Sequence, residues 1–139
     1  MEEVEVEWYG PYKIDTVVEE FHEDEDFGLY MITRKWGEYP EKILYIGLTY
    51  YQDFGTRLSQ HQRWLSTIRG TVKVRIGYLI ENRSSKKRLE DVENLLICWH
   101  NPEYNEKGLV YCGRDLRIIN SGRRGPLDEI VDSDELEYI

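Results

Sequence analysis

The sequence has little cysteine, no long apolar run and no basic leader. Cys98 and Cys112 are the only cysteines in 139 residues, and neither belongs to a CxxC pair. A disulfide framework is therefore excluded, and we expect both thiols to be reduced. No apolar run approaches the roughly eighteen residues of a membrane span, and the N-terminus opens with acids. These absences predict a soluble, unexported, cytoplasmic protein.

The length of the chain limits the number of domains. A chain of 139 residues and 16.7 kDa can bury one complete core and is too short for two. We therefore expect a single domain over residues 1–139. Its core should span about 27–127, with an acidic N-terminal extension at 1–26 and an acidic C-terminal tail at 128–139.

The net charge of -9 is unevenly distributed. Residues 1–26 carry eleven acids and one lysine, and residues 128–139 carry six acids and no base. The interval 27–127 holds seventeen Lys and Arg against ten Asp and Glu. Exposed charges are screened beyond about 8–10 Å at physiological salt, so the basic middle can still attract phosphate. The acidic ends alone are explained as well by solubility.

Two apolar runs in the first third of the chain predict a β-hairpin. Residues 27–32 (FGLYMI) and 43–48 (ILYIGL) have the length and composition of strands, and Gly37, Glu38 and Pro40 between them are typical of a turn. Side chains two residues apart share a face of a strand, and a glycine there allows close approach to the backbone. The paired strands can therefore form the floor of a site.

Periodicity predicts the remaining elements. Residues 1–12 alternate Glu and Val before Gly10-Pro11, which indicates a short edge strand or an arm. Further along the chain we expect an amphipathic helix at 14–21, a helix at 54–68, a strand at 71–80, a helix at 89–99 and a last structured segment at 116–127.

Three residues on the two longer helices stand out. His61 lies in an apolar stripe, where histidine is more often a core residue, but Arg57 precedes it by four residues on the same side. Arginine is rarely buried without an anionic partner. Glu93 has Leu89, Leu96 and Ile97 as helical neighbours. A carboxylate there loses hydration, so it should either bind a metal or pair with a basic side chain.

Basic residues in two other segments are candidates for phosphate contacts. Lys73 and Arg75 alternate with Val72, Val74 and Ile76, which predicts a half-buried strand with a basic outer face. Arg123 and Arg124 lie in a polar turn whose side chains and backbone N–H groups could contact phosphate. An ordinary solvated loop explains that turn equally well.

The order and spacing of these residues resemble the GIY-YIG nuclease superfamily. Gly28-Leu29-Tyr30 stands where the family has GIY, and Tyr45-Ile46-Gly47 matches YIG. Arg57 with His61 is similar to the family's helix motif, Glu93 to its metal-binding glutamate and Asn105 to its downstream asparagine. The leucine is a conservative difference, and the connection between the two tripeptides is somewhat longer than the minimal one. The resemblance covers about residues 27–127.

The resemblance implies a small α/β (α+β) domain with a central three-stranded antiparallel sheet flanked by helices. It also implies a metal-dependent endonuclease that hydrolyses phosphodiester bonds of DNA, which we expect to be double-stranded. Glu93 would hold one Mg²⁺ or Mn²⁺, Arg57 would stabilise the phosphoryl charge, and Tyr30 would orient or deprotonate the attacking water. Tyr45 and His61 would complete the hydrogen-bond network of Tyr30, while Asn105 would position the phosphate or a metal-bound water.

Other functions remain open on the sequence. The chain could be a nucleic-acid-binding or protein-interaction module that keeps the fold without turnover. If it is a nuclease, it has no large recognition domain, so specificity would have to come from loops such as 49–55 and 120–125 or from dimerisation. Both a monomer and a homodimer are compatible with the sequence.

Overall fold

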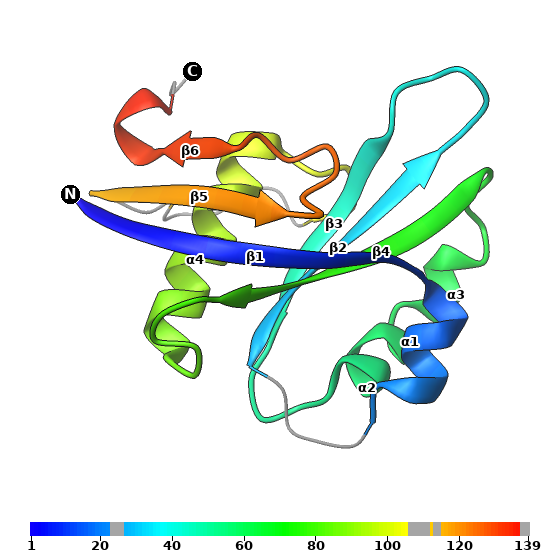
Figure 1. Cartoon of the computed structure of the whole chain (residues 1–139). Coiled ribbons are helices and arrows are strands. Elements are labelled where there is room, and N and C mark those ends of the chain that lie inside the picture. The colour runs from blue at the N-terminus through cyan, green and yellow to red at the C-terminus, as the bar shows by residue number, and fades with distance from the viewer. Residues whose placement is uncertain (23–26, 106–111, 113–114, 137–139) are drawn as a thin grey trace.

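The computed structural model describes residues 1–22, 27–105, 112 and 115–136. These residues form a six-stranded sheet in the order β3-β2-β4-β1-β5-β6, with helices on both faces (Figure 1). The strands are β1 (Glu2–Lys13), β2 (Gly28–Lys35), β3 (Lys42–Thr49), β4 (Thr71–Leu79), β5 (Leu116–Gly122) and β6 (Ile130–Asp132). The helices are α1 (Ile14–Glu20), α2 (Phe54–Ser59), α3 (Gln62–Leu65), α4 (Lys86–His100) and the 3-10 helix η1 (Ser133–Glu135).

The expected three-stranded central sheet flanked by helices is wrong. Strands β3, β2 and β4 form only the first half of a mixed six-stranded sheet. The second half adds β1, which runs antiparallel to β4 and parallel to β5. In Figure 1, β1, β5 and β6 run across the view while β2 and β3 cross it steeply, so the sheet is strongly curled. The described chain is therefore a strand-rich α+β fold with a half-barrel sheet.

The N-terminal segment is an inner strand, not an edge strand or an arm. Strand β1 lies between β4 and β5, and its Val4, Val6 and Trp8 are buried. The Glu-Val alternation correctly indicates one buried face. The partner strand β5 lies more than a hundred residues away, with Val6 opposite Asn120, so local pattern could not place β1 inside the sheet.

The local elements agree better with expectation. The predicted hairpin is confirmed, since β2 and β3 pair antiparallel from Gly28 opposite Thr49 to Arg34 opposite Lys42. At its turn Gly37 has φ +56° with open space around its Cβ position, a conformation that favours glycine. The single helix expected at 54–68 is wrong, because α2 ends at Ser59 and α3 begins only at Gln62.

The sheet separates two hydrophobic cores. On one face, α1, α2 and α3 cover a core that includes Val17, Tyr30, Phe54 and Leu58. On the other face, α4 and the β1, β5 and β6 strands enclose a larger core, whose buried members include Trp8, Met31, Leu96 and Ile118. Alternate residues of β2 therefore face different cores, and both of its faces are covered.

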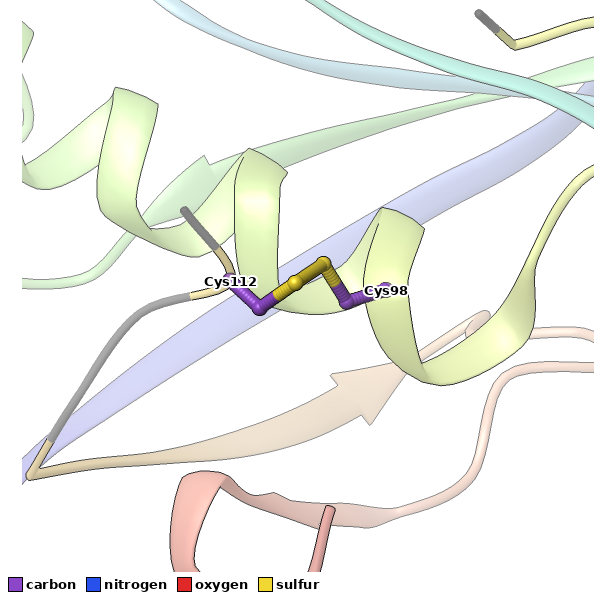
Figure 2. Close-up of a disulfide and its surroundings, with 2 residues drawn as sticks. All are labelled: Cys98 and Cys112. Atoms are coloured by element: carbon purple, nitrogen blue, oxygen red, sulfur yellow. A yellow bond between two sulfur atoms is a disulfide. The ribbon is translucent and has the colours of Figure 1, made fainter. Parts of the chain in front are cut away.

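The cysteines form a disulfide, so the expectation of reduced thiols is wrong. Cys98, near the end of α4, is bonded to Cys112 on the segment that leads to β5 (Figure 2), and the two Cα atoms are 5.7 Å apart. Their separation of 14 residues gave no sign of this contact, which tertiary folding creates. The cysteines therefore give no support to a cytoplasmic location.

Candidate functional site

The two motif glycines make room for neighbouring rings. Tyr30 lies opposite Gly47 in the β2–β3 ladder, and a Cβ atom at Gly47 would lie 2.4 Å from the hydroxyl oxygen of Tyr30. Gly28 similarly lies under the Phe54 ring at the start of α2, where a Cβ atom would come within 2.9 Å. Larger side chains at these positions would displace the phenol or the helix.

A buried hydrogen-bond chain connects β2 with α3. The Tyr30 hydroxyl lies 2.8 Å from Nε2 of His61, and the indole N–H of Trp64 donates to Nδ1 of His61 at 3.1 Å. Because Nδ1 accepts a hydrogen bond, the proton of the neutral imidazole is on Nε2. His61 consequently donates to the Tyr30 oxygen, and the phenol proton is free to point elsewhere.

The two tyrosines differ in their access to solvent. Their rings stack with centroids 5.9 Å apart, and the Tyr45 ring also lies 4.6 Å from that of His61. Tyr30 is fully buried, whereas Tyr45 is half-buried. Of the two phenols, Tyr45 is therefore the one that a water molecule or a substrate can reach in this conformation.

Burial and the Arg57 charge control the ionisation of these groups. Burial raises the pKa of Tyr30, Tyr45 adds to the rise, and Arg57 opposes it. Burial and, to a smaller extent, the Arg57 charge together lower the pKa of His61 to about 4. His61 is thus neutral at physiological pH, as its hydrogen bond from Trp64 also requires. Arg57 itself donates to Gln60 at 2.8 Å.

Glu93 brings a carboxylate into electrostatic contact with Tyr30 and Arg57. It is half-buried on α4, and burial raises its pKa to about 7, with Arg57 opposing and Glu90 adding to the rise. Glu93 also contributes to the raised pKa of Tyr30. The fold therefore brings Arg57 within electrostatic reach of Tyr30, His61 and Glu93, which come from β2, the α2–α3 connection and α4.

The donor set fits one hard cation and nothing more elaborate. Within residues 1–22, 27–105, 112 and 115–136, no three His, Cys, Asp or Glu side chains gather to hold a metal. Mg²⁺ needs fewer protein ligands, because it keeps several waters and is commonly bound by one or two carboxylates together with substrate phosphates. Glu93 fits that role, since it makes no hydrogen bond or ion pair with any described residue.

Asn105 lies at the exposed edge of the hairpin. Its amide N–H donates to the Ile46 carbonyl at 2.8 Å, and its amide oxygen accepts from the Ile46 N–H at 2.9 Å. The backbone N–H of Tyr104 donates to the carbonyl of Leu44, also at 2.8 Å. Asn105 thus fixes the segment after α4 beside Tyr45, while its contact with phosphate or a metal-bound water stays a prediction.

The four predicted phosphate-binding residues do not surround the tyrosines. Tyr30 pairs with Ile76 of β4, whereas Arg75 pairs with Met31 and therefore faces the opposite side of the sheet. Lys73 shares that opposite face. A Cβ atom at Gly125 would lie 2.4 Å from the Arg75 guanidinium carbon, so the turn that carries Arg123 and Arg124 lies on the same side.

Arg75 is also not an exposed base, which corrects the expected basic outer face of β4. It is 7% exposed and donates to both carboxylate oxygens of Glu41, at 2.8 and 3.2 Å. Thr33 donates to the same carboxylate at 2.7 Å. Burial by itself would raise the pKa of Glu41, but the hydrogen bonds from Arg75 and Thr33 outweigh it and lower the pKa. Arg123 is exposed, and Arg124 donates to the Leu127 carbonyl.

Sequence reasoning missed two aromatic residues beside the site. Trp64 hydrogen-bonds to His61 and stacks on Tyr104 with ring centroids 4.6 Å apart. The spacing of three residues between His61 and Trp64 was a usable signal, because residues three apart lie on one side of a helical turn. The position of Tyr104 depends on its backbone contact with β3 and had no local signal.

Comparisons with known proteins give no relative for this chain. No family model, no curated protein and no solved structure matches it. Among the described helices, none is both long and apolar enough to cross a membrane.

Proposed function

We propose that this protein is a metal-dependent DNA endonuclease of the GIY-YIG type. The observation that carries the proposal is the convergence of Tyr30, Tyr45, His61, Arg57 and Glu93 around the β2–β3 hairpin. Hydrolysis of a phosphodiester needs a positioned water, a group that takes its proton and positive charge near the phosphoryl oxygens. The converging side chains supply each of these.

The residue roles follow from their access and charge. Tyr45, the half-buried phenol, contacts the attacking water and accepts its proton as the Tyr45 hydroxyl proton passes to solvent, and Tyr30 behind it fixes the ring of Tyr45 and the hydrogen-bond network. Neutral His61 donates to the Tyr30 oxygen and so fixes the orientation of that hydroxyl beside Tyr45. Arg57 favours the ionised forms of both Tyr30 and Glu93. When bound at Glu93 with the substrate phosphate, Mg²⁺ or Mn²⁺ supplies positive charge to the phosphoryl group.

The direct test is cleavage of supercoiled plasmid DNA by the purified protein. The proposal expects nicked or linear products with Mg²⁺ or Mn²⁺ and intact plasmid in EDTA. Equal cutting in EDTA would remove the metal from the mechanism. Glu90→Gln is a matched control for Glu93→Gln, since both carboxylates lie on α4 and only Glu93 is proposed as a ligand.

A second function is favoured by one observation. Tyr30 is fully buried, as in a ring retained for packing, and this supports a nucleic-acid-binding module without turnover. The plasmid assay separates the two functions when it is combined with a binding measurement. DNA binding without metal-dependent cleavage would select the binding module and reject the nuclease.

A further inference from the structure

The tip of the β2–β3 hairpin carries two exposed aromatic side chains. Trp36 and Tyr39 are 47% and 72% exposed, and their ring centroids are 6.3 Å apart. The guanidinium carbon of Arg34 lies 5.7 Å from the centre of the Trp36 ring. A cavity of about 410 Å³ opens here, lined by Arg34, Trp36, Tyr39, Pro40, Glu41 and Lys42. We call Arg34, Trp36, Tyr39 and Lys42 the tip surface.

The tip surface is held in place by its own backbone. The N–H of Tyr39 donates to the Trp36 carbonyl at 3.1 Å, and the Lys35 ammonium donates to the Tyr39 carbonyl. Gly37 permits the tight turn with φ +56°. The two rings are therefore presented to solvent from a fixed turn, which lowers the entropy cost of binding a ligand on them.

Positive charge extends from the candidate active site to the tip surface. Residues 54–70 contain Arg57, Arg63 and Arg69 and no acid, and Arg63 and Arg69 are exposed. A Cβ atom at Gly70 would lie 3.0 Å from the Cβ of Trp36, so the segment with Arg69 adjoins the tip. Lys42 is paired with Glu103 at 3.1 Å, an exposed ion pair that a phosphate can replace.

The tip surface and Tyr30 belong to the same side of the sheet. Tyr30, Ile32 and Arg34 alternate along β2, so their side chains share a face. Tyr45 lies opposite Ile32 in the β2–β3 ladder, and Trp36 follows Ile32 by four residues, which is roughly 13 Å at about 3.3 Å per residue. This separation corresponds to about four nucleotide steps of 3.4 Å.

We infer that the tip surface binds an unpaired nucleotide located about four positions from the phosphate held at Tyr45 and Glu93. Its base stacks on Tyr39 beside Trp36, and its phosphates contact Arg34 and Lys42. Stacking on an aromatic ring requires a free base face, which a continuous duplex does not offer. The inference rests on the proposed function. The preferred substrate is then DNA with an overhang, flap or gap, and not fully paired DNA.

The experiment compares three labelled DNAs by fluorescence anisotropy in EDTA, where no cleavage occurs. They are a single strand of about 12 nucleotides, the blunt duplex of the same sequence, and that duplex with an unpaired extension of about six nucleotides. We expect the wild-type protein to bind the single strand and the extended duplex more tightly than the blunt duplex.

Removing the rings should abolish this preference. Trp36→Ala and Tyr39→Ala should each weaken binding of the extended duplex by about 5- to 150-fold, the range expected for one stacked base, and leave the blunt duplex within about twofold. Tyr9→Ala is the matched control, because Tyr9 is 42% exposed and lies on β1, outside the hairpin. Lys42→Gln should reduce the slope of log affinity against log salt by about 0.7.

Three results would overturn the inference. The first is equal binding of all three DNAs by the wild-type protein. The second is wild-type affinity for the extended duplex in both ring variants. The third is a dimer that Trp36→Ala dissociates with no change in DNA affinity, since that result would make the tip surface a contact with a second copy of the chain. Because Trp36 and Tyr39 belong to neither hydrophobic core, circular dichroism should show that both ring variants are folded. If Trp36→Ala and Tyr39→Ala weaken binding of the extended duplex but the wild-type protein never nicks plasmid, the proposed nuclease activity is rejected and the binding site at the tip surface is retained.

Discussion

Two polar clusters lie on opposite faces of β2, and one is uncharged whereas the other contains an ion pair. The phenol–imidazole cluster, made of Tyr30, His61 and Trp64, is neutral and adjoins the ionisable Glu93. The ion-pair cluster, made of Thr33, Glu41 and Arg75, neutralises its charges internally through two Arg–carboxylate hydrogen bonds. A closed ion pair contributes to structure, whereas Glu93, which makes no hydrogen bond or ion pair with a described residue, is available to a cation.

The largest effect should come from the hydroxyl of Tyr30. Tyr30→Phe should reduce metal-dependent plasmid nicking by about 100- to 10,000-fold, the usual contribution of a proton-transfer network. It should also cost about 1–3 kcal/mol of unfolding free energy, because the His61 N–H loses its acceptor. Nicking rates and urea titrations measure the two effects. Tyr12→Phe, in the same core, serves as the control, and an unchanged nicking rate for Tyr30→Phe would contradict the proposed network.

The ion-pair cluster should show the opposite pattern, with a large effect on stability and none on activity. Glu41→Gln leaves Arg75 buried without an anion, which should lower the unfolding free energy by about 3–5 kcal/mol. Nicking per folded molecule should not change. The exposed Glu38→Gln in the same hairpin should stay within about 0.5 kcal/mol of wild type. A nicking defect in folded Glu41→Gln would show that the two clusters are coupled.

Glu93 should destabilise the fold above neutral pH. Its folded pKa of about 7 exceeds the unfolded value, so the folded state binds more protons between about pH 4.5 and 7 and loses stability as pH rises. Glu93→Gln should therefore match wild type near pH 4 and be more stable at pH 8, by at most about 3 kcal/mol. Urea titrations at the two pH values measure this difference.

Addition of Mg²⁺ tests whether Glu93 is the metal ligand. Mg²⁺ should stabilise wild type at pH 8 by binding the ionised carboxylate and should leave Glu93→Gln unchanged. The acidic limb of the nicking profile should also move to lower pH as Mg²⁺ rises. If Mg²⁺ stabilised both proteins equally, its site would not include Glu93.

The smallest effect should come from the indole N–H of Trp64. Trp64→Phe removes the donor to Nδ1 of His61, which should cost about 1 kcal/mol of stability and free the imidazole tautomer. The ¹⁵N shifts of His61 should report a proton on Nε2 alone in wild type and a mixture in the variant. A mixture of the two neutral His61 tautomers in the wild-type protein would contradict the assigned hydrogen-bond direction.

Local pattern in the sequence predicted the elements that depend on neighbours along the chain. The hairpin, α1, β4 and α4 follow from strand alternation and helical spacing, and they deliver Tyr30, Tyr45 and Glu93 to one region. The division of the helix after Ser59 escaped prediction, because the apolar stripe continues through it.

Features that depend on distant partners could not be predicted. The pairing of β1 with β5 and the bond between Cys98 and Cys112 are made by tertiary folding. Arg75 was expected in solvent because a base alternating with valines usually faces water. Both faces of β4 are covered here, so the Arg75 side chain is buried, and the ion pair with Glu41 compensates the charge of its guanidinium.

The hydrogen bonds of Asn105 have a consequence for association between molecules. A sheet that does not close into a barrel has two edges at which another chain could add a strand. At the β3 edge, Tyr104 and Asn105 occupy the backbone groups of Leu44 and Ile46. At the other edge, β6 has only three residues. Among the described residues, both edges thus leave foreign strands little to pair with, and a concentrated solution should remain free of edge-to-edge fibres.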